Sequence, residues 1–358
     1  MRVFEWFTPE DSISWPRVLL VVVAVVVVLG VGTAAAISLE PFNPYNPTWE
    51  GTSEFRSDVI HGGEHDGEVM YRFGYDDLDG EGTVAFVVAP TDGYDAADVE
   101  AISSFLDRGG TLIVLDNFGE HGPALLDDLG ADARLDGQVL RDDRYYDVGP
   151  AMPVANQISP HDLTVGVETL ALNFGTAIRV DSAEVLIATS EFAYLGPELE
   201  ELDDEDLRSY AVATVEPMGD GQLVVVGDPS ITINEMLDRG DNRVFLEALV
   251  ADAEHVVMDV SRAGGVPPLW FGLLELRGSA WLQLGLGVLA VLTIVAVAYR
   301  GELRTRFARD AVQPPTMDRE AVETYLRVYH HDLDEAHLER VMRALNEDGG
   351  EAVSDSDE

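Results

Sequence analysis

The chain has 358 residues, and its 66 Asp and Glu residues against 22 Lys and Arg give a formal net charge of −44. There is no cysteine, which excludes disulfides, thiolate metal sites and cysteine nucleophiles. Every basic residue is arginine, and no basic stripe is available to neutralise phosphates. We therefore expect no nucleic acid partner.

The acidic excess predicts a high-salt environment rather than a site for a basic ligand. Such a charge normally strains a folded chain through self-repulsion. At molar salt the Debye length shrinks to about 3 Å, which screens that repulsion. The composition is therefore typical of a protein from a halophile.

The first long segment is apolar. Val18–Ala36 is an uncharged run, about 28 Å long as a helix, and a bilayer core is about 30 Å thick. We predict a transmembrane helix over residues 17–38, preceded by a cytoplasmic N-terminus at 1–16. A cleaved signal peptide is the alternative, because Ala34–Ala36 resembles a cleavage site.

A second uncharged apolar run, Ala280–Ala298, lies between the interfacial aromatics Trp281 and Tyr299 and predicts a transmembrane helix over 279–299. Four arginines follow it directly: Arg300, Arg304, Arg306 and Arg309. By the positive-inside rule this end is cytoplasmic. We therefore expect a two-pass protein of the cell membrane, with both termini cytoplasmic and residues 40–276 outside.

The external region is organised around residues 83–117. Val84–Ala89 reads as a strand buried on both faces. Asp95 can cap a following helix, with Asp98 completing an imperfect capping box. Gly109 ends that helix, and Thr111–Asp116 reads as a second buried strand. Strand, short helix and strand of this length predict one crossover of a parallel sheet.

Further elements extend this unit into one α/β domain with a mostly parallel sheet and helices on both faces. The predicted strands are Glu68–Gly74 (at an edge), Thr169–Leu172, Ala177–Val180, Glu184–Ala188, Tyr210–Val215 and Gln222–Gly227, and the predicted helices are Gly122–Leu129 and Asp241–Ala251. Residues 131–160 read as irregular.

Residues 300–345 predict a cytoplasmic helical hairpin. Apolar side chains recur there at helical spacing in two sets, Val322, Tyr325, Leu326, Tyr329 and Leu338, Val341, Met342, Leu345. Two short amphipathic helices bury little alone, so we expect them to pair with each other, the membrane or a partner. Residues 346–358 form an acidic tail that we expect to be disordered.

Three groups of side chains resemble metal ligands: His61 with His65, the acids Asp76, Asp77 and Asp79, and the tail histidines His330, His331 and His337. The acidic loop lacks the spaced acids and terminal glutamate of a calcium loop. A charge run is usually a solvated loop. We therefore expect no metal and no cofactor.

The candidate ligand-binding residues follow two predicted strands. In an open parallel sheet, ligands sit at the carboxyl ends of the strands. Asp116 and Asn117 follow one strand, and Asp228 and Ser230 follow another.

The same residues permit a catalytic hypothesis, with Ser230 as nucleophile, His121 as base and Asp116 orienting the base. Ser230 lacks the glycine-flanked elbow of GxSxG hydrolases. A serine after Asp-Pro is also a routine turn or helix-start residue. The sequence therefore favours a binding role, with a cell-surface serine hydrolase as an alternative.

The stretch TVAFVVAPTDGYDAADVEAISSFLDRGGTLIVLDN, with GDGQLVVVGDPSITINEMLDRGDNRVFLEAL further along, resembles the family catalogued as domain of unknown function 4350. The resemblance implies a membrane-tethered domain of the flavodoxin-like fold that is similar to class I glutamine amidotransferases. The amidotransferases of that fold use a cysteine nucleophile, which this chain lacks. The resemblance also implies protein partners, because family members occur beside MoxR-type AAA+ ATPases and proteins with von Willebrand-like domains.

We therefore expect a membrane-anchored, non-catalytic binding or assembly protein. Its external domain and its cytoplasmic tail would each contact protein partners, within a MoxR-type system. A related domain occurs in auxiliary subunits of ABC-type exporters, which is a second alternative.

Overall fold

The computed structural model describes residues 15–196, 207–264 and 279–298, together with five isolated positions between 268 and 324. It divides into two compact units, Met1–Gly278 and Ser279–Glu358. The helices are α1 (Trp15–Ala36), α2 (Ser53–Phe55), α3 (Ala96–Asp107), α4 (His121–Asp128), α5 (Asn242–Ala248) and α7 (Ala280–Ala298), with shorter turns η2 (Arg56–Ile60), η3 (Tyr75–Asp77), η4 (Asp162–Thr164) and η7 (Pro229–Thr232). The strands are β1 (Asp66–Met70), β2 (Thr83–Val88), β3 (Thr111–Leu115), β4 (Arg134–Leu135), β5 (Leu140–Asp142), β6 (Val154–Ala155), β7 (Gln157–Ile158), β8 (Leu170–Ala171), β9 (Ile178–Arg179), β10 (Glu184–Ala188), β11 (Ala193–Leu195), β12 (Ala211–Met218), β13 (Gly221–Val226) and β14 (His255–Asp259).

The crossover predicted around residues 83–117 is confirmed. Strands β2 and β3 pair in parallel, with Val84 opposite Thr111. Asp95 caps α3 by accepting from the backbone N–H groups of Ala97 and Asp98, and the Asp98 side chain accepts from the N–H of Asp95. The capping box is therefore complete with aspartate at both positions, because the shorter acid still reaches the N-cap amide.

Five strands form the parallel half of the main sheet, in the order β1-β14-β2-β3-β13. The edge position predicted for the first strand is confirmed. β14 was not predicted from the sequence, yet it lies between β1 and β2. Among flavodoxin-like folds the order is 2-1-3-4-5. Here the place next to the edge strand is taken by the last strand of the chain instead of the first.

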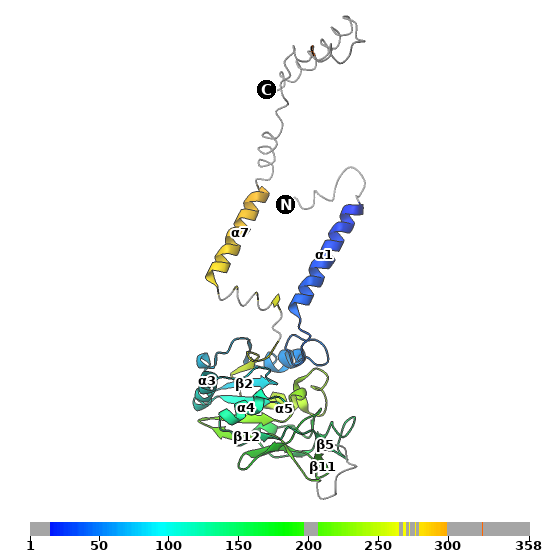
Figure 1. Ribbon diagram of the computed structural model, residues 1–358, viewed down its shortest axis with the longest axis vertical. Coiled ribbons are helices and arrows are strands. Elements are labelled where there is room, and N and C mark those ends of the chain that lie inside the picture. The colour runs from blue at the N-terminus through cyan, green and yellow to red at the C-terminus, as the bar shows by residue number, and fades with distance from the viewer. Residues whose placement is uncertain are drawn as a thin grey trace. The chain divides into compact units, whose positions relative to one another are not determined.

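The other half of the sheet is antiparallel. β12 pairs with β13 through a tight hairpin, and β10 and β7 extend the sheet beyond β12. Gly219 in the hairpin has φ +61°, and a β-carbon there would lie 2.4 Å from a carboxylate oxygen of Asp107 at the end of α3. Only glycine fits such a turn against the helix. Figure 1 shows the small ladder of β5 and β11 at the end of the domain remote from β2. Residues 131–160, expected to be irregular, contain only strands of two or three residues.

Helices cover both faces of the sheet, as predicted. Alternate residues of β2 point to opposite sides: Phe86 packs in the same cluster as Phe245 of α5, whereas Val87 packs with Phe105 of α3. All four side chains are buried. Because both faces are covered, the parallel strands read as continuous apolar runs.

Helices α1 and α7 occupy the places of the two predicted membrane spans, and their described side chains are largely apolar and exposed. In the part of the chain that the structure describes, however, no helix combines the length and the apolar character needed to cross a membrane. The predicted transmembrane helices at 17–38 and 279–299 are therefore not supported. The predicted N-terminal segment up to residue 14, the tail hairpin and the acidic tail lie outside the described residues, apart from the single position Thr324.

The Asp95 cap gives a test of the fold. Asp95→Ala removes the acceptor for two backbone N–H groups of α3 and should lower the free energy of unfolding by about 1 kcal/mol. Glu100→Ala, on the exposed side of the same helix, is the matched control and should have almost no effect. Urea unfolding of both variants measures the difference. Equal losses would contradict the capping role.

Candidate binding site at the carboxyl edge of the sheet

The carboxyl ends of β3 and β13 lie side by side, because the two strands pair in parallel with Leu115 opposite Val226. The chain leaves β3 towards α4, whose Leu125 and Leu126 pack on one face of the sheet. It leaves β13 towards η7 and α5, which pack on the other face. This divergence is the topological switch point at which ligands bind in open α/β sheets. The four predicted residues Asp116, Asn117, Asp228 and Ser230 are all placed here.

The carboxylate of Asp116 accepts three hydrogen bonds from backbone N–H groups. It accepts from the N–H groups of Asn117 (2.8 Å), Gly119 (3.3 Å) and Gly122 (3.2 Å). A β-carbon at Gly119 or Gly122 would lie 2.5 Å or 2.2 Å from Oδ2 of Asp116, so both positions need glycine. Burial raises the pKa of Asp116, against the opposing effect of these backbone donors and of His121.

Asp228, like Asp116, accepts hydrogen bonds from backbone N–H groups. It is completely buried and accepts from the N–H groups of Ser230 (2.8 Å) and Asn173 (2.6 Å). Burial raises the pKa of Asp228 to about 6, although these hydrogen bonds oppose the shift. Its role is to cap η7 and to hold the segment around Asn173 against the end of β13.

The structure does not assemble Ser230, His121 and Asp116 into a triad. Ser230 is 95% buried and its hydroxyl donates to the carbonyl of Asn173 at 3.3 Å. His121 is the first residue of α4. Within the described residues no hydrogen bond joins the His121 ring to Ser230 or to Asp116. A nucleophile needs a base within about 3.2 Å, and the Ser230 hydroxyl lies instead beside the carbonyl of Asn173 and the carboxylate of Asp228.

A segment from elsewhere in the chain fills the switch point. The N–H of Thr176 donates to the carbonyl of Gly227 (2.7 Å), and the side chain of Asn117 donates to the carbonyl of Phe174 (3.1 Å). A β-carbon at Gly175 would lie 3.1 Å from the Cβ of Asp228. We call Asn173–Thr176 the plug, since it closes the crevice between β3 and β13.

The plug was missed by sequence reasoning, although a signal exists. The tripeptide Asn-Phe-Gly occurs at 117–119, directly after β3, and again at 173–175 within the plug. The structure brings the two copies together and leaves Phe118 and Phe174 exposed by 45% and 51%. Phe174 has φ +55°, a conformation that is uncommon for a bulky residue.

Further exposed apolar side chains lie on the loop beside the plug. The N–H of Phe174 donates to the carbonyl of Ala151, and Tyr146 bridges to Pro153. The large apolar residues exposed on these three neighbouring loops are Phe118, Tyr145, Tyr146, Val148 and Phe174, and we call them the aromatic rim. Large exposed apolar patches on folded domains commonly serve in binding.

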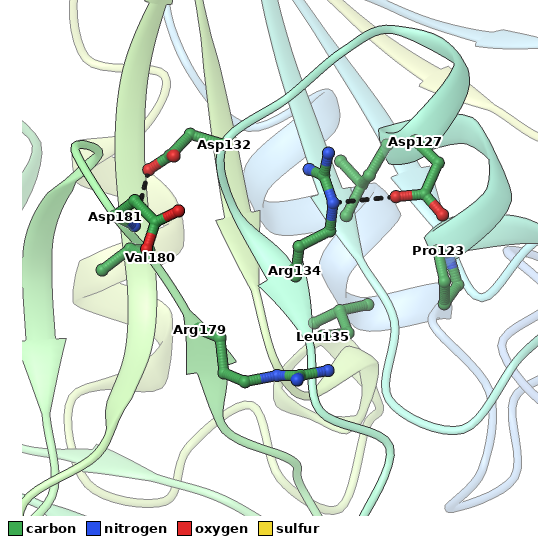
Figure 2. A pocket seen from close by; sticks show the side chains of 9 residues that line it. Pro123, Asp127, Asp132, Arg134, Leu135, Arg179, Val180 and Asp181 are labelled. Atoms are coloured by element: carbon green, nitrogen blue, oxygen red, sulfur yellow. Dashed lines mark hydrogen bonds and ion pairs between the residues drawn. The ribbon is translucent and has the colours of Figure 1, made fainter.

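A second concavity, of about 380 Å³, lies between α4, β4 and β9. Figure 2 shows Arg134 bound to Asp127 (2.8 Å) and Asp132 turned towards the backbone of Asp181. Asp132 also accepts from the N–H groups of residues 182 and 183, and these donors lower its pKa. Asp127, Asp132 and Arg134 are thus already engaged within the domain, so this pocket is the weaker candidate.

The described histidines and acids do not suggest a metal centre. The ring of His65 contacts the carbonyls of Val59 (2.9 Å) and Ile60 (3.2 Å), and Asp76 and Asp77 belong to η3. Among the residues that the structure covers, no group of three or more potential ligands could hold a metal ion. His330, His331 and His337 lie outside them.

Comparison with solved structures gives only distant likenesses. The N-terminal domain of mmIFT52 is 17% identical with a TM-score of 0.37, covering 47% of this chain and 73% of that one. A cytoplasmic protein of Salmonella typhimurium LT2 is 10% identical with a TM-score of 0.35, covering 56% and 84%. A beta-galactosidase from Bacillus circulans sp. alkalophilus is 16% identical with a TM-score of 0.27, and only 22% of that chain is matched. With scores this low, none of them bears on activity.

A search of curated proteins gave no match. The family profile described as domain of unknown function (DUF4350) matches residues 44–250, which is more than half of the chain and nearly the whole α/β domain. The protein therefore belongs to the DUF4350 family.

Proposed function

We propose that this protein is a non-catalytic binding protein whose α/β domain presents the aromatic rim to a protein partner. The observation that carries the proposal is the plug. The place where an open α/β enzyme would hold its substrate is occupied by the chain's own backbone. The two carboxylates there, those of Asp116 and Asp228, accept hydrogen bonds from backbone N–H groups.

The geometry gives no support to the hydrolase alternative. The hydroxyl of Ser230 is buried and engaged with a carbonyl, and the chain has no cysteine to supply the nucleophile of an amidotransferase. The amidotransferase-like relationship rests on the parallel sheet alone. A fold of this type without its nucleophile is better suited to binding than to chemistry.

The nature of the rim favours a protein partner. Phe118 and Phe174 are held at the ends of rigid strands and on the plug, so little conformational entropy is lost when they are buried by a partner. Aromatic side chains dominate the binding energy of protein interfaces. The family resemblance suggests a partner from a MoxR-type assembly, with the ATPase meeting the tail, or else an ABC-type exporter.

We further propose that the domain is anchored to a membrane by its two apolar segments. The support is the absence of charged residues from Val18–Ala36 and Ala280–Ala298 and the exposure of the described apolar side chains of α1 and α7. Exposed side chains of this kind favour an apolar surrounding over water. The arginines after residue 299 would place the tail in the cytoplasm and the domain outside, and the net charge of −44 is consistent with a high-salt exterior.

The rim predicts a partner-binding defect. Phe118→Ser combined with Phe174→Asn removes both rings while keeping residue 174 a type that tolerates positive φ. Crosslinking in high salt, followed by purification of the full chain, should yield at least tenfold less of the partner captured by the native protein. Val165→Ser is the control, since Val165 is even more exposed, at 67%, but lies outside the rim. Undiminished capture by the double variant would contradict the proposal.

The anchoring proposal predicts that the full chain stays with the membrane pellet after an alkaline carbonate wash, because integral segments resist extraction. Protease added to intact cells should digest the domain and spare an epitope at the C-terminus. Removal of residues 15–36 and 279–298 together should release the domain. Release of the unmodified protein by carbonate would show peripheral attachment instead.

A further inference from the structure

Four buried polar atoms without a hydrogen-bond partner gather where β14 ends. They are the Tyr75 hydroxyl, Oδ2 of Asp259, the Ser261 hydroxyl and Nε of Arg262. A buried polar atom left unpaired costs about 1–3 kcal/mol, and most native domains contain few. These four atoms lie together at a point that is separate from the plug. We therefore treat the end of β14 as a second candidate functional site.

Asp259 is held from one side only. Its Oδ1 accepts from the N–H of Ser261 at 2.8 Å, whereas Oδ2 has the hydroxyls of Tyr75 and Ser261 nearby but no well-aligned hydrogen bond from them. Tyr75 is fully buried, with its ring edge-on to Phe105 at 5.5 Å between centroids.

The positive charge nearby is already engaged. The guanidinium of Arg262 bonds to the carboxylate of Asp98 in α3 and lies over the rings of Phe73 (5.5 Å) and Tyr94 (5.8 Å). The titratable and charged groups around Asp259 are thus Tyr75 from η3, Tyr94 from the loop after β2, Arg262 from its own strand end, and Asp98 through Arg262.

The residues after Asp259 form the exit segment, Val260–Gly264, through which the chain leaves the domain. The carbonyl of Arg262 accepts from the N–H groups of Thr91 (2.8 Å) and Asp92 (3.0 Å). The carbonyl of Gly264 accepts from the side chain of Asn43 (3.2 Å), shortly after the end of α1. The exit segment therefore ties the loop after β2 to the segment that follows α1.

We propose that Tyr75, Asp259, Ser261 and Arg262 form a clasp controlled by a proton: neutral Asp259 keeps the exit segment closed against the sheet, and ionised Asp259 releases it. When neutral, the carboxyl can donate to a neighbouring hydroxyl and needs no counter-charge. When ionised, it needs water or a cation, and movement of the exit segment supplies water.

The direction of the pH effect follows from the burial of Asp259. Burial raises its pKa above the ordinary value, and the weaker influences of Ser261, Tyr75 and Arg262 lower it. The closed form therefore binds the proton more tightly than an open form that exposes the carboxyl to water. Closure is most stable below the ordinary carboxyl pKa and weakens as the pH rises through the raised pKa.

Hydrogen exchange of the full-length protein tests the clasp. Asp259→Asn keeps the acceptor for Ser261 and cannot ionise. The measured quantity is the exchange rate of peptides covering 260–264 in the native protein divided by that in the variant at the same pH, which cancels the intrinsic pH dependence of exchange. The ratio should be near one at pH 3, below the ordinary carboxyl value of 3.8. It should rise as the pH increases, about tenfold for each unit by which the pKa is raised, and level off above the raised pKa. A constant ratio, or faster exchange in the variant throughout, would overturn the proposal.

Two further variants serve as controls for this experiment. Asp92→Asn removes the same charge from an exposed position beside the exit segment, and its exchange should follow the native protein. Tyr75→Phe removes a hydroxyl that lowers the pKa of Asp259, so the rise in exchange should continue to higher pH than in the native protein before it levels off. An unmoved rise in Tyr75→Phe would count against the clasp even if Asp259→Asn did not fold.

Discussion

The satisfaction of two buried carboxylates by backbone N–H groups decides what the carboxyl edge of this sheet can do. Asp116 and Asp228 follow adjacent parallel strands at the switch point, where such acids commonly hold a ligand or metal. Here Asp116 accepts from the loop after β3 and from the first turn of α4, and Asp228 accepts from Ser230 and from the plug. Each acid therefore holds neighbouring backbone in place. The recognition surface that we propose is the aromatic rim, whose residues are exposed on the adjoining loops.

The aromatic rim differs from what the composition leads one to expect of the surface. A chain with a net charge of −44 has an acidic surface, and exposed phenylalanines on such a surface have no role in solubility. Phe118 and Phe174 are positioned by an asparagine side chain that crosses between the two Asn-Phe-Gly copies. If the rim binds a partner as proposed, its position at strand ends pre-organises it, which lowers the cost of association.

Local elements were predictable from the sequence, and contacts distant along the chain were not. The crossover over residues 83–117 follows from apolar runs, a cap and paired glycines, all within one stretch, and it is confirmed together with helices on both faces. β14 was not predicted because its five residues, His255–Asp259, are too few to show the periodicity that identifies a strand. Its insertion beside β1 is a nonlocal pairing that no local signal encodes.

The candidate site divides along the same line. Asp116, Asn117, Asp228 and Ser230 were placed at strand ends by pattern, and the structure brings them together. The plug was not foreseen, because the bond from Asn117 to Phe174 spans 57 residues. The repeated Asn-Phe-Gly was the available signal. Likewise, the partnerless polar atoms around Asp259 belong to four separate residues whose meeting depends on the unpredicted strand.

The central claim is that the switch point is closed by the chain itself, and chemical labelling of Ser230 tests it most directly. A fluorophosphonate probe should leave the native protein unlabelled in high salt, as it should Ser230→Ala, while a known serine hydrolase in the same mixture reacts. Labelling of the native chain that disappears in Ser230→Ala would show an open crevice with an activated hydroxyl, and would contradict the account.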